Sequence, residues 1–192
     1  MTPTPPALLL DTCAIINLSY CSPVAVLFKS RYSGRAGWTL AVQAELTRQR
    51  TRKPPHPQAG RARNWAVTWL NQPIEICDEI DQVAVEGIQA AVAVGSADDN
   101  LDHLGEATSI HLLTTAGTGR LISDDHGARA VARGRYNVRA SSTVGVLAEL
   151  LARGAVTRET VDVYLETLRT HERMHLTLTS TDLLAGDLGS WV

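Results

Sequence analysis

The sequence predicts an α/β fold with a central, mainly parallel sheet flanked by helices and with a helical C-terminal extension. Short apolar runs of strand type alternate along the chain with longer segments of helical periodicity, an order typical of parallel α/β proteins. Two of these runs end directly in aspartate, at the strand ends where such folds bind ligands. The composition of 192 residues, 44% hydrophobic and 20% charged, is that of a folded domain and excludes a disordered or collagen-like chain.

The first strand is expected at 7–10 (Ala-Leu-Leu-Leu), an apolar run that suits a buried strand and that ends at Asp11. Apolar residues at helical spacing follow over 13–18 and 23–32. Ser22, which precedes a proline, is the expected N-cap of the second helix.

The patterns in the middle of the chain predict two more strands, three helices and one loop. In order, these are a strand at 37–40, a helix from about Val42, a loop at 51–60, a helix around 65–70, a strand at 74–77 and a helix at 80–94. The loop holds three prolines and therefore cannot lie inside a helix or strand.

The last part of the chain continues the alternation and then departs from it. The expected elements are a helix at 104–115, a strand at 120–123, a helix through 133, a strand at 136–139 and a helix at 144–152. Two further helices, at 159–171 and 180–186, lie outside the rhythm. We therefore expect one domain over 1–155 and a helical extension over 156–192.

Charge is segregated along the chain although the net charge is only −2. Residues 29–63 hold nine basic residues and one acid, whereas residues 64–119 hold nine acids and no lysine or arginine. The first segment suits a polyanion such as nucleic acid, and the second suits cations or a basic partner. The alternative is that the two segments attract each other within the fold.

Cysteine content and hydropathy bear on the compartment. The three cysteines are odd in number and have no C-x-x-C spacing, which argues against a disulfide scaffold and against a cysteine zinc site. The apolar run at 7–10 is too short for a signal peptide, and no stretch is long enough to span a bilayer. We expect a cytoplasmic protein without a membrane partner.

Five carboxylates are expected at one rim of the sheet. Asp11 ends the first strand, Asp124 and Asp125 end a later one, and neighbouring parallel strands bring such ends together. Glu45 and Glu106 lie early in their helices and reach the same rim. Close pairs of like charge repel by about 4 kcal/mol at an effective dielectric near 20, so the cluster is tolerable only if it is protonated or holds a hard cation. Oxygen ligands favour Mg²⁺ or Mn²⁺ over zinc.

Four segments of the sequence resemble the motifs of PIN domains, in that family's order. They are an apolar strand with aspartate and a hydroxyl residue at 8–18, a second acid within 41–46, a Gly-Glu-Ala motif within 104–110, and a strand with serine and paired acids at 121–129. The resemblance implies the three-layer PIN fold. It also implies a metal-dependent nuclease that most often cuts single-stranded RNA and is often the toxin of a VapC-type toxin–antitoxin pair.

The resemblance also assigns the catalytic and metal-binding residues. By position in the motifs, these are Asp11, Glu45, Glu106 and Asp125, with Asp124 as an alternative or additional ligand. Thr12 and Ser123 match the hydroxyl positions that orient the first and last acids. The implied chemistry is metal-assisted hydrolysis, in which one ion makes hydroxide from water and the ions steady the charge on the phosphate.

Charge segregation fits this interpretation, because the basic segment would guide the RNA backbone toward the acids with salt-sensitive affinity. The residues expected to do so are Arg48, Arg50, Arg52 and Lys53. VapC-like relatives also imply an antitoxin protein and a homodimer, with the helix at 23–32 as its expected interface.

Other interpretations stay open. Asp11 and Asp125 are also good helix N-caps, although capping does not require the acids to share a rim. A catalytically silent PIN-like module would instead bind nucleic acid or protein through the segment 48–63.

A zinc peptidase is a further alternative, because the chain contains an H-E-x-x-H motif. Its residues are His171, Glu172 and His175. Peptidases of this type need a third ligand further along the chain, and no histidine or glutamate follows the motif.

Overall fold

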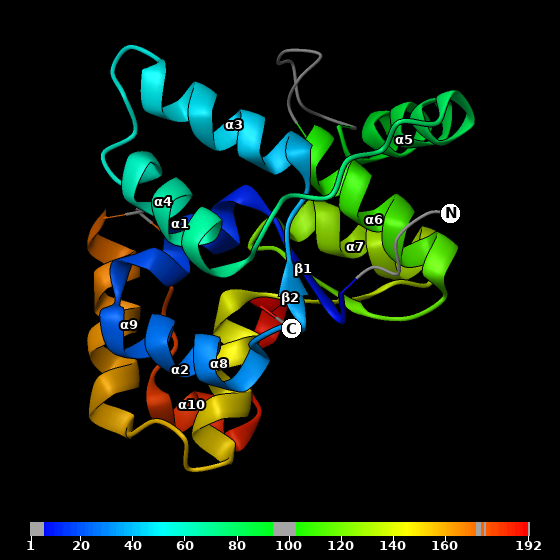
Figure 1. The fold of residues 1–192 in the computed structure, drawn as a ribbon. Coiled ribbons are helices and arrows are strands. Elements are labelled where there is room, and N and C mark those ends of the chain that lie inside the picture. Colours follow the sequence, from blue (N-terminus) through cyan, green and yellow to red (C-terminus); the bar gives the residue numbers. More distant parts are fainter. Residues whose placement is uncertain (1–5, 94–102, 172–173, 175, 192) are drawn as a thin grey trace.

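The computed structural model describes residues 6–93, 103–171, 174 and 176–191. Four parallel strands form the central sheet in the order β2-β1-β3-β4 (Figure 1). They are β1 (Leu8–Leu10), β2 (Ala36–Gly37), β3 (Arg120–Ile122) and β4 (Arg139–Ser141). The predicted α/β class with a parallel sheet is confirmed.

Helices connect and cover these strands. The helices before β3 are α1 (Thr12–Tyr20), α2 (Ser22–Tyr32), α3 (Leu40–Thr51), α4 (Ala59–Trp69), α5 (Glu79–Val92) and α6 (Leu104–Ala116). Those after β3 are α7 (His126–Tyr136), α8 (Thr143–Ala152), α9 (Arg158–His171), α10 (Ser180–Ala185) and the 3₁₀ turn η1 (Gly189–Trp191). Within the described residues, none of these helices has the length and apolar character needed to cross a membrane.

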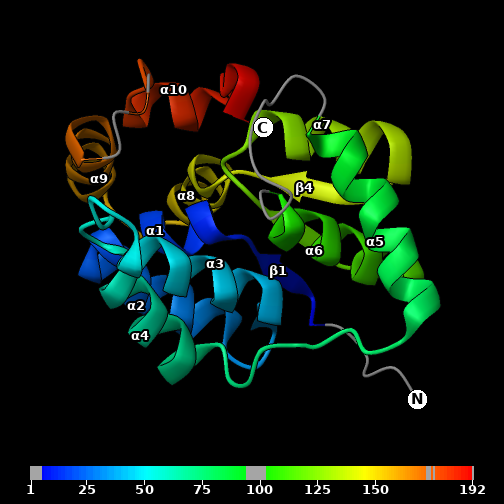
Figure 2. The ribbon, with the colours of Figure 1, turned by 90° about the horizontal axis from the view of Figure 1, so that it is seen from above.

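Alternate residues of the central strands point to opposite faces of the sheet, and two separate cores result. Leu8, Leu10 and Ile122 pack in one core with residues of α1, α2, α8 and α9. Leu9 and Leu121 pack in the other with residues of α5, α6 and α7. Both faces of β1 are thus buried, which explains its unbroken run of leucines. Helices therefore cover both faces of the sheet (Figure 2), as the three-layer prediction requires.

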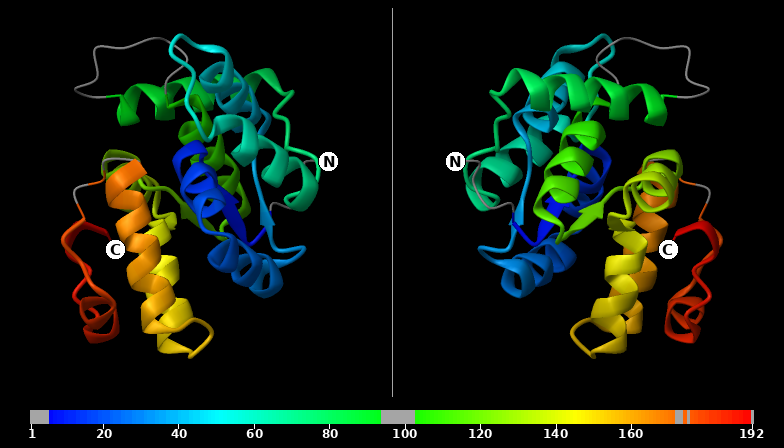
Figure 3. Two further views of the ribbon diagram at one scale, coloured as in Figure 1. Left: turned by 90° about the vertical axis from the view of Figure 1, so that its left-hand side faces the viewer. Right: turned by 90° about the vertical axis from the view of Figure 1, so that its right-hand side faces the viewer.

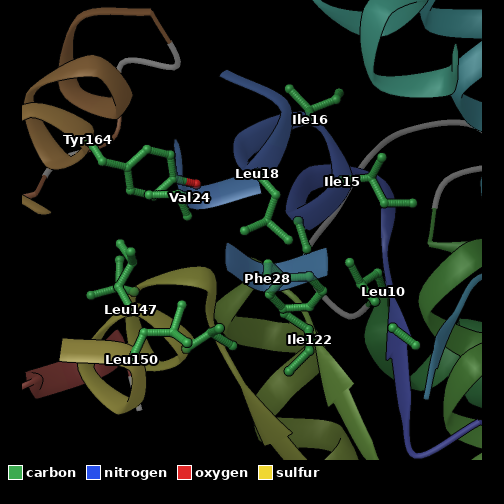
Figure 4. Packing of buried hydrophobic residues seen from close by; sticks show 14 of the residues in the cluster. Leu10, Ile15, Ile16, Leu18, Val24, Phe28, Ile122, Leu147, Leu150 and Tyr164 are labelled. Atoms are coloured by element: carbon green, nitrogen blue, oxygen red, sulfur yellow. The ribbon is translucent and has the colours of Figure 1, made fainter. Parts of the chain in front are cut away.

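The helices beyond residue 155 pack on the first core. Tyr164 of α9 belongs to the same buried cluster as Val24, Phe28 and Leu147 (Figure 4). The Asp162 carboxylate accepts hydrogen bonds from the amide and hydroxyl of the first residue of α10, at 2.8 and 2.9 Å. Figure 3 shows α9 and α10 beside α8. The division of the chain into 1–155 and 156–192 stays a prediction.

Two predicted strands are shorter than expected. At 37–40 the strand covers only Ala36–Gly37, because Thr39 instead caps α3 and its Oγ1 accepts from the Val42 amide at 3.3 Å. At 74–77 the strand is reduced to one bridge between Ile74 and Thr39.

Two other expected boundaries were wrong. The last strand begins at Arg139 because α7 continues to Tyr136 and Asn137 then adopts a left-handed conformation with φ of 53°. Ser22 is the first residue of α2, and the N-cap is Cys21, whose side chain makes no capping hydrogen bond.

Candidate metal centre

β1 and β3 are neighbours, which brings the first and last predicted acids to the same edge of the sheet. Leu10 pairs with Ile122, and the Asp11 amide donates to the Ile122 carbonyl at 3.0 Å. Asp11 is fully buried, and its Oδ1 caps α1 by accepting from the Ala14 amide at 2.6 Å. Its Oδ2 is buried without a hydrogen-bond partner among the described residues. Capping therefore explains only one of the two carboxylate oxygens.

Two hydrogen bonds orient Glu45, one from α1 and one from its own helix. Its Oε2 accepts from the Thr12 hydroxyl at 2.6 Å, and its Oε1 accepts from Gln49 Nε2 at 3.3 Å. The Thr12 hydroxyl thus orients the second acid rather than the first, the one that the sequence motif had suggested. Because Glu45 and Gln49 lie one turn apart on α3, Gln49 can hold the Glu45 carboxylate from within the same helix.

Glu106 reaches the centre because α6 approaches α3 closely. A Cβ atom on Gly105 would lie 2.7 Å from Cγ2 of Val42 and 3.5 Å from Oε2 of Glu45. Glycine at this position therefore allows the first turn of α6 to lie against the Glu45 carboxylate. Glu106 follows in that turn and is only 5% exposed.

Asp125 and His103 complete a group of ligand atoms around Glu106. Asp125 Oδ1 caps α7 by accepting from the Ala128 amide at 2.8 Å, so this acid too is an N-cap. Its Oδ2 lies 4.0 Å from Nδ1 of His103. One ligand atom each from His103, Glu106 and Asp125 lies within 4.8 Å of the others. This spacing is compatible with shared ligation of one cation.

His103 is the residue that sequence reasoning missed. It precedes α6 and has a left-handed backbone with φ of 64°. Histidine is enriched in this conformation relative to most residues and is a common metal ligand. Its position three residues before Glu106 was the sequence signal that could have identified it as a metal ligand. The backbone conformation, however, is what directs its ring to Asp125.

Asp124 is engaged by the protein itself. Its Oδ1 accepts from the Thr143 amide at 2.8 Å, and its Oδ2 accepts from the Thr143 hydroxyl and from Asn17 Nδ2, both at 2.7 Å. These bonds join the end of β3 to the first turn of α8 and to α1. Burial raises the pKa of the Asp124 carboxyl, while the bonds from Thr143 and Asn17 oppose that rise.

The centre concentrates negative charge in a buried space. Burial raises the pKa of the Asp11 carboxyl well above its usual range, and the charge of Glu106 adds to the rise. Although Cys13 is exposed as a residue, desolvation of its sulfur raises the pKa of the thiol, and the charges of Asp11, Glu106, Glu45 and Asp124 add to the rise. Four predicted acids therefore act on one thiol, and a bound cation would offset their mutual repulsion.

A buried arginine ties this centre to the C-terminal segment. Arg129 of α7 donates to the Ser123 carbonyl at 2.9 Å and to the Ser190 carbonyl. Its Cζ lies 5.9 Å from the ring centroid of Trp191. The Ser123 hydroxyl in turn accepts from the Asp125 amide at 3.1 Å, which fixes the backbone of the last acid.

These donors fit a divalent cation. Asp11 supplies a buried oxygen without a hydrogen-bond donor among the described residues, and His103, Glu106 and Asp125 supply three close ligand atoms. Carboxylate oxygens suit Mg²⁺ and Mn²⁺, whereas imidazole suits transition metals. Most of these donors are carboxylate oxygens, so the set is compatible with either Mg²⁺ or Mn²⁺.

The four cations expected to guide RNA are not equivalent. Arg52 lines a pocket of about 370 Å³ that Asp124 and Asp125 also line. Arg50 lies toward α4, since a Cβ on Gly60 would be 3.3 Å from its Cδ. Lys53 is exposed and Arg48 is half-buried, and neither lines the pocket.

A family model described as a PIN domain matches residues 7–183. The chain belongs to the PIN-domain family. Comparisons with curated proteins and with solved structures find no significant match. The PIN match extends beyond the four motif segments, which end at residue 129, and includes α8, α9 and the first part of α10.

PIN membership agrees with the donor set described above. PIN domains are typically nucleases and usually use divalent metal ions, and this chain brings a cluster of possible ligands to the carboxyl edge of its sheet. The coarser prediction of a nuclease-like PIN fold is thereby supported by both the family and the geometry.

The zinc-peptidase motif has no comparable support. His171 is the last residue of α9, and its ring stacks on Tyr20 with centroids 5.3 Å apart. Glu172 and His175 lie outside the described residues. Met174, between them, is not helical, whereas an H-E-x-x-H site needs both histidines on one helix.

Proposed function

We propose that this PIN domain is a metal-dependent endoribonuclease that hydrolyses phosphodiester bonds with Mn²⁺ or Mg²⁺. The observation that carries the proposal is the buried Asp11 Oδ2, which accepts no hydrogen bond from the described residues and lies at the strand edge shared with Asp125. A purely structural N-cap does not need a second, buried carboxylate oxygen.

In this proposal Asp11, Glu106, Asp125 and His103 hold the metal, which supplies a Lewis acid for activating water and for stabilising charge on the phosphate. Glu45 is a further ligand, oriented by the Thr12 hydroxyl. Asp124 acts as a positioning residue, because its oxygens are engaged by Thr143 and Asn17. Asp125 is therefore the main ligand of the adjacent pair.

In this proposal, basic side chains that lie beside the acidic residues bind the substrate. Arg52 lines the pocket that the two adjacent aspartates also line, so its guanidinium is suited to a phosphate of the RNA backbone. Arg48, Arg50 and Lys53 extend the positive charge along the same helix end and would add salt-sensitive, sequence-independent affinity.

The test combines metal binding with cleavage of a labelled single-stranded RNA. Wild type is expected to gain thermal stability with Mn²⁺ and to cut the RNA, because a ligand of the native state raises its melting temperature. Asp11→Asn is expected to lose both effects. Asp187→Asn, a substitution of an exposed acid on the C-terminal side, serves as the matched control and retains both.

Full cleavage by Asp11→Asn would overturn the assignment of the centre. Wild type that neither cuts RNA nor responds to Mn²⁺ would instead favour the silent binding module. In that case RNA binding that depends on residues 48–63 would identify its function.

We further propose a protein partner, as in a toxin–antitoxin pair, on the basis of exposed apolar residues. Ile80 and Val83 of α5 are 80% and 68% exposed. An apolar pocket of about 420 Å³ lies nearby, between α3, α5 and α6. By contrast, Val26 is the one large exposed apolar side chain of α2, so that helix is less suited to a homodimer interface.

The compartment proposed is the cytoplasm. The three cysteines, Cys13, Cys21 and Cys77, are all free thiols, which suits a reducing environment.

A further inference from the structure

The pocket beside the metal centre has walls of two kinds. One wall is formed by the acids and by the end of α3, with Arg52 and His56. The other includes Met174 and Trp191, which lie beyond residue 155 in the part of the chain that the helical rhythm set apart. Its volume of about 370 Å³ lies within the range of about 300–1,000 Å³ that is typical of small-molecule sites.

Two hydrogen bonds hold the backbone of Trp191, and a buried arginine lies near its ring. The Ser142 hydroxyl donates to its carbonyl, and its amide donates to the Leu188 carbonyl at 2.9 Å. Arg129, which bonds the end of β3, lies near its ring. The fixed backbone places the ring at the pocket wall, and a ring face is suited to stacking on a nucleobase.

The polar groups of the pocket have defined hydrogen-bonding roles. Both N–H groups of Asn17 are engaged, one by Asp124 and one by the Met174 sulfur at 3.5 Å, so its amide can offer a ligand only an acceptor. Nδ1 of His56 accepts from the Gln58 amide at 3.2 Å.

An aromatic wall, an arginine and a fixed acceptor together match a nucleotide. We propose that this pocket binds the RNA nucleotide next to the scissile phosphate, with its base against Trp191 and Met174 and its phosphate at Arg52. This inference deepens the ribonuclease proposal and rests on it. Its consequence is that residues of the C-terminal segment determine which base the enzyme prefers beside the cut.

The first test measures binding without cleavage. The four nucleoside 5′-monophosphates AMP, GMP, CMP and UMP are titrated into the full-length protein by calorimetry. We expect one of them to bind several-fold more tightly than the others. Trp191→Ala is expected to lower the affinity for that nucleotide about tenfold and to remove the preference among the four. Trp191→Phe is expected to retain the preference.

Arg52→Gln is expected to lower the affinity for all four nucleotides to a similar extent, because the substitution removes a phosphate contact and not a base contact. Arg158→Gln, at an exposed position at the start of α9, is the matched control and binds like wild type. Should Trp191→Ala fail to fold, Met174→Ala and Arg52→Gln carry the same comparison. Unchanged affinity and preference in these pocket variants would overturn the proposal.

Cysteine labelling provides an independent readout. Cys13 is exposed and lines the pocket, whereas the exposed Cys77 lies outside it. The bound nucleotide is expected to slow alkylation of Cys13 and to leave Cys77 unchanged. Equal rates with and without nucleotide would place the ligand elsewhere.

The second test separates the pocket from the nuclease activity. If wild type cuts RNA with a base preference that Trp191→Ala does not alter, the ribonuclease stands and the pocket assignment is overturned. If wild type does not cut RNA but binds a nucleotide through Trp191 and Arg52, the pocket stands as a nucleotide site and the ribonuclease proposal fails. Binding of an antitoxin-like protein that Trp191→Ala abolishes, without nucleotide binding, would also overturn the pocket proposal.

Discussion

The Thr12 hydroxyl donates a 2.6 Å hydrogen bond to Oε2 of Glu45 and thereby joins α1 to α3 across 33 positions of the sequence. Thr12 directly follows Asp11, so the same turn of the chain carries one acid and orients another. Together with the bond from Gln49 to Oε1, the Thr12 bond engages one lone pair on each oxygen of Glu45 and leaves the other lone pair of each for a cation.

Thr12→Ala is expected to lower Mn²⁺ affinity by about tenfold, because residues that orient metal ligands typically contribute this much. Thr12→Ser restores the hydroxyl and is expected to restore most of the affinity. Both are measured by calorimetric titration of the full-length protein with MnCl₂. Equal affinities in wild type and Thr12→Ala would show that Glu45 does not ligate the ion.

Without metal, Asp11 makes the protein less stable as pH rises. Its pKa is raised by burial and by Glu106 above the unfolded value of 3.8, so its contribution is fully present below that value and is lost as pH rises through the native pKa. In EDTA at pH 7, Asp11→Asn is therefore expected to melt at least about 2–4 °C above wild type. Asparagine keeps the helix cap.

Thermal unfolding from pH 4 to pH 8 in EDTA checks this expectation. The difference between Asp11→Asn and wild type should widen toward neutral pH. Addition of Mn²⁺ should reverse the order, since only wild type gains from the ion. A difference that stays constant with pH would contradict the direction given for the Asp11 carboxyl.

His103→Asn tests the imidazole as a metal ligand. Asparagine tolerates the left-handed backbone at this position, so the turn before α6 should be preserved. Mn²⁺ affinity is expected to fall about tenfold and Mg²⁺ affinity to fall less, because imidazole binds transition metals better than Mg²⁺. Calorimetric titrations with each ion measure the ratio, and an unchanged ratio would exclude His103 from the ligand set.

Gly105→Ala tests the close approach of α6 to α3. The new methyl group would meet Val42 at 2.7 Å, so the substitution is expected to destabilise the fold by about 1–3 kcal/mol in urea unfolding. Gly87→Ala, at an exposed helical position where a Cβ meets nothing within 4 Å, is the matched control. It should instead stabilise the protein by about 0.5–1 kcal/mol. A neutral Gly105→Ala variant would mean that α6 can move without cost.

The sheet and the edge that holds the acids followed from short apolar runs that end in aspartate, because this pattern depends on local sequence. The separate functions of Asp124 and Asp125 did not, since they depend on Thr143 at the start of α8, which reaches β3 only through the strand order. His103 was missed because its backbone conformation, rather than its spacing, directs its ring. The observed strand ends differ from the predicted ones by one to three residues. Thr39 caps a helix where a strand was predicted to continue, and the turn at Asn137 delays the start of the last strand.

Arg129 gives its N–H groups to the carbonyls of Ser123 and Ser190 rather than to carboxylates. A guanidinium bound to the acids in a two-pronged salt bridge would neutralise them and compete with any incoming ion. Because Arg129 binds backbone carbonyls instead, it stabilises the chain segments beside the centre. The negative charge of the acids is then left to be neutralised by a bound cation. The positive charge of Arg129 then acts only through longer-range repulsion. It slightly lowers the affinity of the site for every cation, whichever ion that is.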